Sequence, residues 1–113
     1  MSEPTPIDVP PGLRGLAGFD AGVIDALRDM RLDLERRSVL DERTTELIRL
    51  GALVALQAPA ESFTAHVVRL RRMGVPAEEI WSAVISVAPM TGVPPLINAG
   101  PAIEQAIRDA DAS

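Results

Sequence analysis

Apolar residues recur along this sequence at spacings of three and four, and this pattern limits the possible folds more than any other feature. After Asp20, a residue type that often caps helices, Val23, Leu27, Met30 and Leu34 follow at spacings of four, three and four. Residues spaced in this way lie on one face of an α-helix. No segment alternates apolar and polar residues clearly enough to predict a strand, so the sequence predicts an all-α fold.

Two more helices are expected in the middle of the chain. Asp41 is suited to cap a helix that runs through a largely apolar segment to Leu56. Pro59 and its small neighbours predict a turn, and another helical stripe follows over residues 63–73. Gly74 can then adopt the left-handed conformation that commonly ends a helix.

A fourth helix is expected to begin at Pro76. Proline suits the first helical position, and Glu78 and Glu79 place negative charge at the positive end of the helix dipole. This helix is expected to stop near Pro89 and Gly92, which disfavour its continuation.

The last helix is expected to run from about Pro94 to the polar residues 109–113. Gly100 and Pro101 should bend or split it, because proline lacks the backbone N–H that a helix needs. Together these segments predict a bundle of about five helices.

The length of 113 residues favours a single domain. Residues 1–12 are rich in proline and polar residues, so we expect a flexible arm there and a helical domain over residues 13–113. The arm has acidic residues and prolines in place of a basic region and an apolar stretch. This argues against a signal peptide and favours the cytoplasm.

Composition excludes some classes of partner. A net charge of -5 and a hydrophobic fraction of 47% are typical of globular proteins. All the basic residues are arginines in runs of two at most, so a surface for nucleic acid is not expected. A membrane is not expected either, because the apolar run from Leu47 is interrupted by Arg49 and is shorter than the about 20 residues that a spanning helix needs.

Two of the expected helices are unusually apolar for a small protein. Residues 47–56 and 80–87 carry apolar side chains on more than one face, and the remaining helices cannot easily cover both segments. Because exposed apolar patches usually mark interfaces, we expect a homo-oligomer. The alternative is one well-covered core in a monomer.

The chain contains no cysteine. This excludes disulfides, thiolate metal sites and dithiol chemistry. One histidine without cysteine does not supply the usual nitrogen and sulfur ligands of zinc, and there is no glycine-rich phosphate loop or GxSxG motif. We therefore expect neither a metal nor an organic cofactor.

His66 is the one histidine of the chain and a candidate acid or base. Ser62 lies four residues before it and Arg69 three residues after it, so helical spacing places all three on one side of the expected helix. Imidazole is well suited to proton transfer near neutral pH. The alternative is a histidine at the edge of the core whose ring is satisfied by a backbone carbonyl or water.

Glu46 is the second candidate, because it directly precedes the apolar run 47–56. A carboxylate at this position must reach solvent or find a donor, since an unpaired buried charge costs several kcal/mol. Arg43 and Arg49 lie three residues on either side, so surface ion pairs offer a purely structural alternative.

Three segments, LDERTTELIRLGALVAL, AHVVRLRRMGVPAEEIWSAV and PMTGVPPLINAGPAI, follow one another between Leu40 and about Ala106. In this order they resemble the carboxymuconolactone decarboxylase family, which also contains alkylhydroperoxidase D-like proteins. The resemblance implies an all-α subunit that forms trimers or hexamers with active sites near subunit boundaries.

In the peroxidase-type branch of this family, a glutamate on one helix precedes a CxxCxxxH motif on the next. Laid on this sequence, the glutamate falls on Glu46 and the histidine on His66, but the cysteine positions fall on Pro59 and Ser62. Since peroxide reduction there depends on thiolates, thiol peroxidase activity is not expected. The decarboxylase branch does not need these cysteines and is the nearer relative.

The resemblance therefore implies cofactor-free decarboxylation of a small organic acid or lactone. His66 would exchange the proton and Glu46 would orient it, while Arg49, Ser62 and Arg69 would bind the substrate. Two alternatives stay open. One is a non-catalytic oligomeric binding or scaffold protein, and the other is an isomerase or cyclase of secondary metabolism that uses the same residues.

Overall fold

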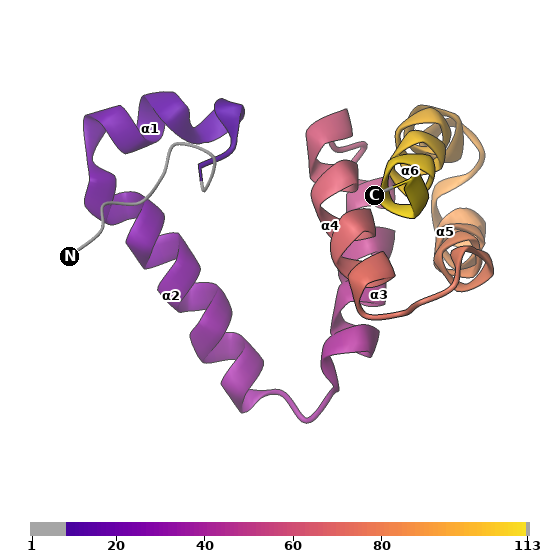
Figure 1. Cartoon of the computed structure of the whole chain (residues 1–113), viewed down its shortest axis with the longest axis horizontal. Coiled ribbons are helices and arrows are strands. Elements are labelled where there is room, and N and C mark those ends of the chain that lie inside the picture. The colour runs from indigo at the N-terminus through magenta and orange to yellow at the C-terminus, as the bar shows by residue number, and fades with distance from the viewer. Residues whose placement is uncertain (1–8, 113) are drawn as a thin grey trace. The chain divides into compact units, whose positions relative to one another are not determined.

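The computed structural model describes residues 9–112, and the regular structure in this range is entirely helical (Figure 1). After a short 3-10 turn the order of helices is α1 (Arg14–Phe19), α2 (Ala21–Arg37), α3 (Glu42–Ala55), α4 (Ala60–Arg72), α5 (Ala77–Thr91) and α6 (Pro94–Ala112). Within this range, residues 9–39 form one compact unit and residues 40–112 form another. The prediction of an all-α fold is confirmed.

The described residues form six α-helices, where about five were predicted. The additional one is α1, whose sequence RGLAGF contains two glycines and therefore does not indicate a helix. Residues 1–8 of the predicted arm lie outside the described residues, and the boundary after residue 12 stays a prediction.

Helix α2 begins where the sequence predicted. The Asp20 carboxylate accepts a hydrogen bond of 2.9 Å from the N–H of Gly22 and so caps the helix. The predicted apolar stripe is present, but none of its residues is buried: Leu27 is 42% exposed and both Met30 and Leu34 are 57% exposed. Within its own compact unit, α2 therefore leaves its apolar face uncovered.

Helices α3 and α4 both end with a residue of positive φ. Gln57 follows α3 with a φ of 53°, and Gly74 follows α4 with a φ of 82°. In each case the next N–H, that of Ala58 or Val75, donates to a carbonyl five residues earlier, at 3.0 and 3.1 Å. This is the Schellman motif. The prediction for Gly74 is confirmed, whereas Gln57 was not predicted because residues with a side chain rarely adopt this conformation.

The prolines interrupt the helices less than predicted. Pro76 is the cap residue before α5 and not its first residue. Pro89 lies inside α5, and the helix ends at Thr91, directly before Gly92, as predicted. Pro101 lies inside α6, which runs through it as one helix and is not split. Both internal prolines are exposed, so water can satisfy the carbonyls that they leave without a donor.

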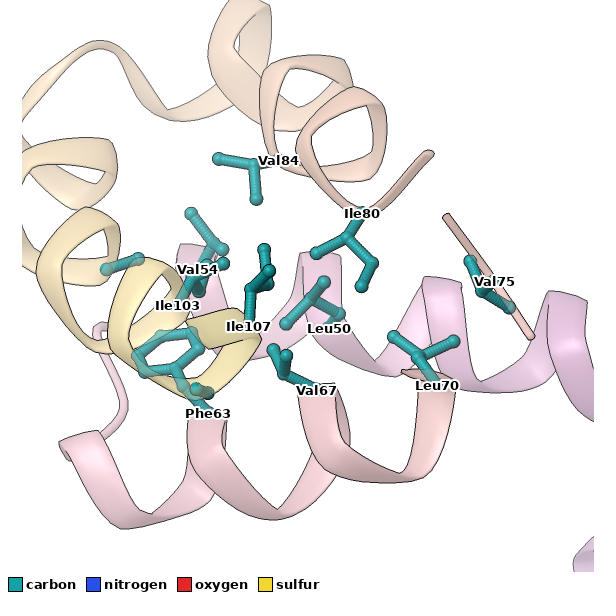
Figure 2. Close-up of a cluster of buried hydrophobic side chains, with 12 residues drawn as sticks. Leu50, Val54, Phe63, Val67, Leu70, Val75, Ile80, Val84, Ile103 and Ile107 are labelled. Carbon is teal, nitrogen blue, oxygen red and sulfur yellow. The ribbon is translucent and has the colours of Figure 1, made fainter. Parts of the chain in front are cut away.

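The hydrophobic core lies among α3, α4, α5 and α6 in the unit that begins at Leu40 (Figure 2). Helix α4 packs against α6 and α3, and α3 also packs against α5. The largest fully buried side chains are Phe63, Leu50, Leu70, Ile80, Ile103, Val54, Val67 and Val75. Burying each of these stabilises the fold by about 1.5–3 kcal/mol before the entropic cost of ordering the chain.

Candidate functional site

The candidate acid and base residues come from the helix pair α3 and α4. Glu46 lies one turn before the core residue Leu50 on α3, and His66 lies next to the core residue Val67 on α4. A short loop joins the two helices, and their apolar stripes pack against the same core (Figure 2). This packing brings two residues that are far apart in the sequence to the same place.

Glu46 and His66 contact each other directly. The Nδ1 atom of His66 lies 2.7 Å from the Oε2 atom of Glu46. The glutamate side chain is 3% exposed and the histidine side chain 22% exposed. Because an ionised carboxylate can only accept, Nδ1 donates the proton of this hydrogen bond, and Nε2 carries the lone pair whenever the ring is neutral.

Two arginines complete the cluster around Glu46. The Oε1 atom of Glu46 accepts hydrogen bonds from the Nη1 atoms of Arg49 and Arg69, each at 3.1 Å. Arg49 shares α3 with Glu46, whereas Arg69 shares α4 with His66. The sequence predicted both arginines as substrate ligands, and the structure directs one N–H of each towards the glutamate.

The carboxyl of Glu46 is held in its ionised form. Burial raises its pKa, but the hydrogen bond and charge of His66, together with the charge and hydrogen bond of Arg69, lower it by more. The pKa of Glu46 therefore lies below its ordinary value of 4.5, and the residue is an anion at neutral pH.

Two other residues from the sequence analysis lie apart from this hydrogen-bonded cluster. Ser62 lies one turn before His66 on α4, and in the described part of the chain its hydroxyl makes no hydrogen bond to the cluster. Arg43, which was considered as a surface partner of Glu46, pairs with Glu79 of α5. Of the two arginines that the sequence offered as ion-pair partners of Glu46, Arg49 therefore contacts it and Arg43 pairs elsewhere.

A separate apolar groove lies between α3 and α5, with a volume of about 690 Å³. Its walls are formed by Thr44, Leu47, Ile48, Gly51, Ala52, Ala55, Glu79, Ser82, Ala83, Ser86 and Val87. Neither Glu46 nor His66 lines it. The two helices approach closely at Gly51, where an added Cβ would lie 3.1 Å from Cγ1 of Val87.

Two other kinds of feature are not formed within residues 9–112. No group of three or more His, Cys, Asp and Glu side chains in this range is arranged to hold a metal ion. No helix there combines the length and the apolar character needed to cross a bilayer.

Comparison with known proteins bears on the origin of this cluster. The model of the carboxymuconolactone decarboxylase family matches residues 21–105, which includes α2 as well as the segments with the resemblance described above. No curated protein and no solved structure matches the chain. The family match covers Glu46, His66 and both arginines, and it spans more than two thirds of the sequence. The chain therefore belongs to the carboxymuconolactone decarboxylase family.

Proposed function

We propose that this protein carries out acid/base chemistry without a cofactor, most specifically the decarboxylation of a small organic acid or lactone. The observation that carries the proposal is the 2.7 Å contact between Nδ1 of His66 and Oε2 of Glu46. A base oriented by a buried carboxylate is the arrangement that many enzymes use to transfer a proton. Family membership supports the same class of reaction.

In the proposed reaction, Nε2 of the neutral His66 ring first takes up a proton from solvent, which forms the imidazolium. When the bond to the departing carboxylate breaks, its electron pair stays on the substrate carbon and carbon dioxide leaves. The carbanion or enolate that results takes a proton from the imidazolium form of His66. Glu46 keeps its charge throughout and stabilises that imidazolium.

The substrate would be held beside this pair by Arg49, Arg69 and Ser62. Each guanidinium has five N–H donors, and one donor of each arginine is directed to Glu46. The other N–H groups of Arg69, whose side chain is 38% exposed, suit a substrate carboxylate. The Ser62 hydroxyl, one turn from His66, suits a carbonyl or hydroxyl oxygen of the same molecule.

We also infer that the protein assembles with copies of itself. Ile48, which lines the apolar groove, is 57% exposed, and Ile85 and Ile97 are 63% and 68% exposed. Exposed apolar surface of this kind favours association. Assembly would also reduce the solvent around the partly exposed His66.

The decisive experiment replaces His66 by glutamine, which removes the proton-transfer group and leaves a polar side chain of similar size. Carbon dioxide release is measured with a panel of small carboxylic acids and carboxylated lactones. We expect turnover to fall by about 100-fold or more while helix content and oligomer size stay unchanged. Arg72→Gln, an exposed change on the same helix, serves as the control.

Turnover that survives His66→Gln would rule out the assignment of His66. Ligand binding without product, indifferent to loss of both His66 and Glu46, would instead support the non-catalytic alternative. Conversion of a substrate to an isomer without release of carbon dioxide would support the isomerase alternative.

A further inference from the structure

We propose that Arg69 is a positioning residue of the acid/base pair, and that it acts through Glu46 to hold His66 in the tautomer with its proton on Nδ1. The inference deepens the proposed function and rests on it. It starts from the contacts that the two oxygens of the Glu46 carboxylate make with α4. Oε2 contacts His66, and Oε1 contacts Arg69.

The two contacts together fix the orientation of the carboxylate plane. Nδ1 of His66 lies 2.7 Å from one oxygen, and Nη1 of Arg69 lies 3.1 Å from the other. His66 and Arg69 are three residues apart and therefore lie on the same side of one rigid helix. A carboxylate held at one oxygen can turn about its terminal bond, whereas one held at both oxygens by the same helix cannot.

The contact of Arg49 differs in kind from that of Arg69, although it also lies 3.1 Å from Oε1. Arg49 is on α3 with Glu46, so its hydrogen bond to Oε1 does not tie the carboxylate to α4, the helix that carries His66. The electrostatics agree with this difference. Burial raises the pKa of Glu46, and Arg69, after His66, is the side chain whose charge and hydrogen bond lower it.

The orientation of the carboxylate determines the state of the imidazole. A carboxylate oxygen in line with Nδ1 accepts a hydrogen bond from Nδ1–H, so the lone pair of the neutral ring is on Nε2. If the carboxylate turns away, Nδ1 loses its acceptor and the proton can reside on either nitrogen. Arg69 thus decides which nitrogen is available as the base.

The tautomer can be measured directly, because the chain has one histidine and gives one pair of ring nitrogen signals. The protein is labelled with ¹⁵N-histidine, and its spectrum is recorded at a pH where the ring is neutral. In the unsubstituted protein we expect Nδ1 to appear as the protonated nitrogen and Nε2 as the unprotonated one. In Arg69→Gln we expect both signals to shift towards the averaged positions of a tautomer mixture.

Arg72→Gln is the matched control, since it removes the same charge from an exposed position of α4. Signals that stay unchanged in both variants, or that shift equally in both, would overturn the proposal. Should Arg69→Gln not fold, Arg69→Lys is compared with Arg72→Lys by the same signals. A mixed tautomer in Arg69→Lys alone supports the proposal, and no difference between the two overturns it.

The tautomer measurement needs no substrate, so its result is independent of whether the protein turns over a carboxylic acid. A single Nδ1–H tautomer that depends on Arg69, in a protein without activity, would leave the positioning role intact and remove the proposed function. With an active substrate in hand, we expect Arg69→Gln to lower kcat. A raised KM with unchanged kcat would make Arg69 a substrate ligand only and overturn the positioning role.

Discussion

Glu46 is 2% exposed as a residue, and its carboxyl is ionised. A buried charge without partners costs several kcal/mol, and here His66, Arg49 and Arg69 provide three hydrogen bonds to its two oxygens. These donors come from two helices. The group that orients the candidate base therefore also joins α3 to α4, and its replacement should affect both stability and reactivity.

The free energy of unfolding should depend on Glu46 in a pH-dependent way. Its pKa lies below 4.5 in the folded protein and rises to about that value on unfolding, so the unfolded chain binds the proton more readily. The stabilisation is fully present above pH 4.5 and is lost as the pH falls through the folded-state pKa. At neutral pH we expect Glu46→Gln to lower the free energy of unfolding by about 2 kcal/mol.

Urea unfolding at neutral and acidic pH, followed by circular dichroism, measures this difference. Below pH 4.5 the gap between the two proteins should shrink. The pKa of Asp41 is also lowered, mainly by its hydrogen bond from the backbone N–H of Thr44. Because Asp41 is present in both proteins, its contribution to the pH dependence cancels in the difference between them. Glu104→Gln, in an exposed ion pair with Arg108, is the control. A gap that stays constant across the pH range would contradict the role of the Glu46 charge.

At the scale of the elements, the ends of α3 and α4 share one geometry with different residues. Both helices close with a Schellman motif whose left-handed position is Gln57 in one and Gly74 in the other. A residue with a Cβ pays a steric penalty in this conformation that glycine does not. The end of α3 thus stores strain that the end of α4 avoids.

Introducing glycine at position 57 and removing glycine at position 74 should change the free energy of unfolding in opposite directions. Gln57→Gly is expected to raise the free energy of unfolding by about 0.5–1 kcal/mol, and Gly74→Ala to lower it by about 1 kcal/mol. No atom lies within 4 Å of a Cβ added at Gly74, so the cost there would come from the backbone and not from a clash. Thermal and urea unfolding measure both changes. Stabilisation by Gly74→Ala would contradict this account.

The sequence was informative about the elements wherever a capping residue preceded a regular apolar stripe, as in α2, α3 and α4. It failed for α1, which has no such stripe, and it allowed a split of α6 at Pro101 that does not occur, because an exposed proline can be accommodated inside a helix. For the site, residue type and helical position singled out His66 and Glu46, and the resemblance pointed to the same two residues. Their contact and the direction of Arg69 depend on how α3 and α4 are placed against each other, which spacing along one helix does not encode.

At the scale of the whole molecule, apolar surface is distributed over both compact units. Met30 in the first unit is 57% exposed, and Ile85 and Met90 in the second are 63% and 87% exposed. A single chain with this much apolar surface is expected to associate. The inferred self-assembly therefore follows from the surface of both units and from the groove between α3 and α5.

Light scattering after size-exclusion chromatography tests the assembly. We expect the unsubstituted protein to elute as a multiple of its chain mass of 12.0 kDa. Ile48→Glu places a charge in the wall of the apolar groove and should shift the population towards the monomer. Val39→Glu, at a fully exposed position, should not. A monomeric parent protein, or equal behaviour of the two variants, would contradict the inference.

Because Gly51 has no side chain, the residue at position 51 controls how closely α3 and α5 approach each other and so how wide the groove is. Because a methyl group there would press against Val87, even alanine would act as a spacer between α3 and α5. The acid/base pair lies where α3 packs against α4, whereas the groove lies between α3 and α5. One carbon atom at position 51 could thus reshape what the groove accommodates while the proton-transfer residues keep their distances.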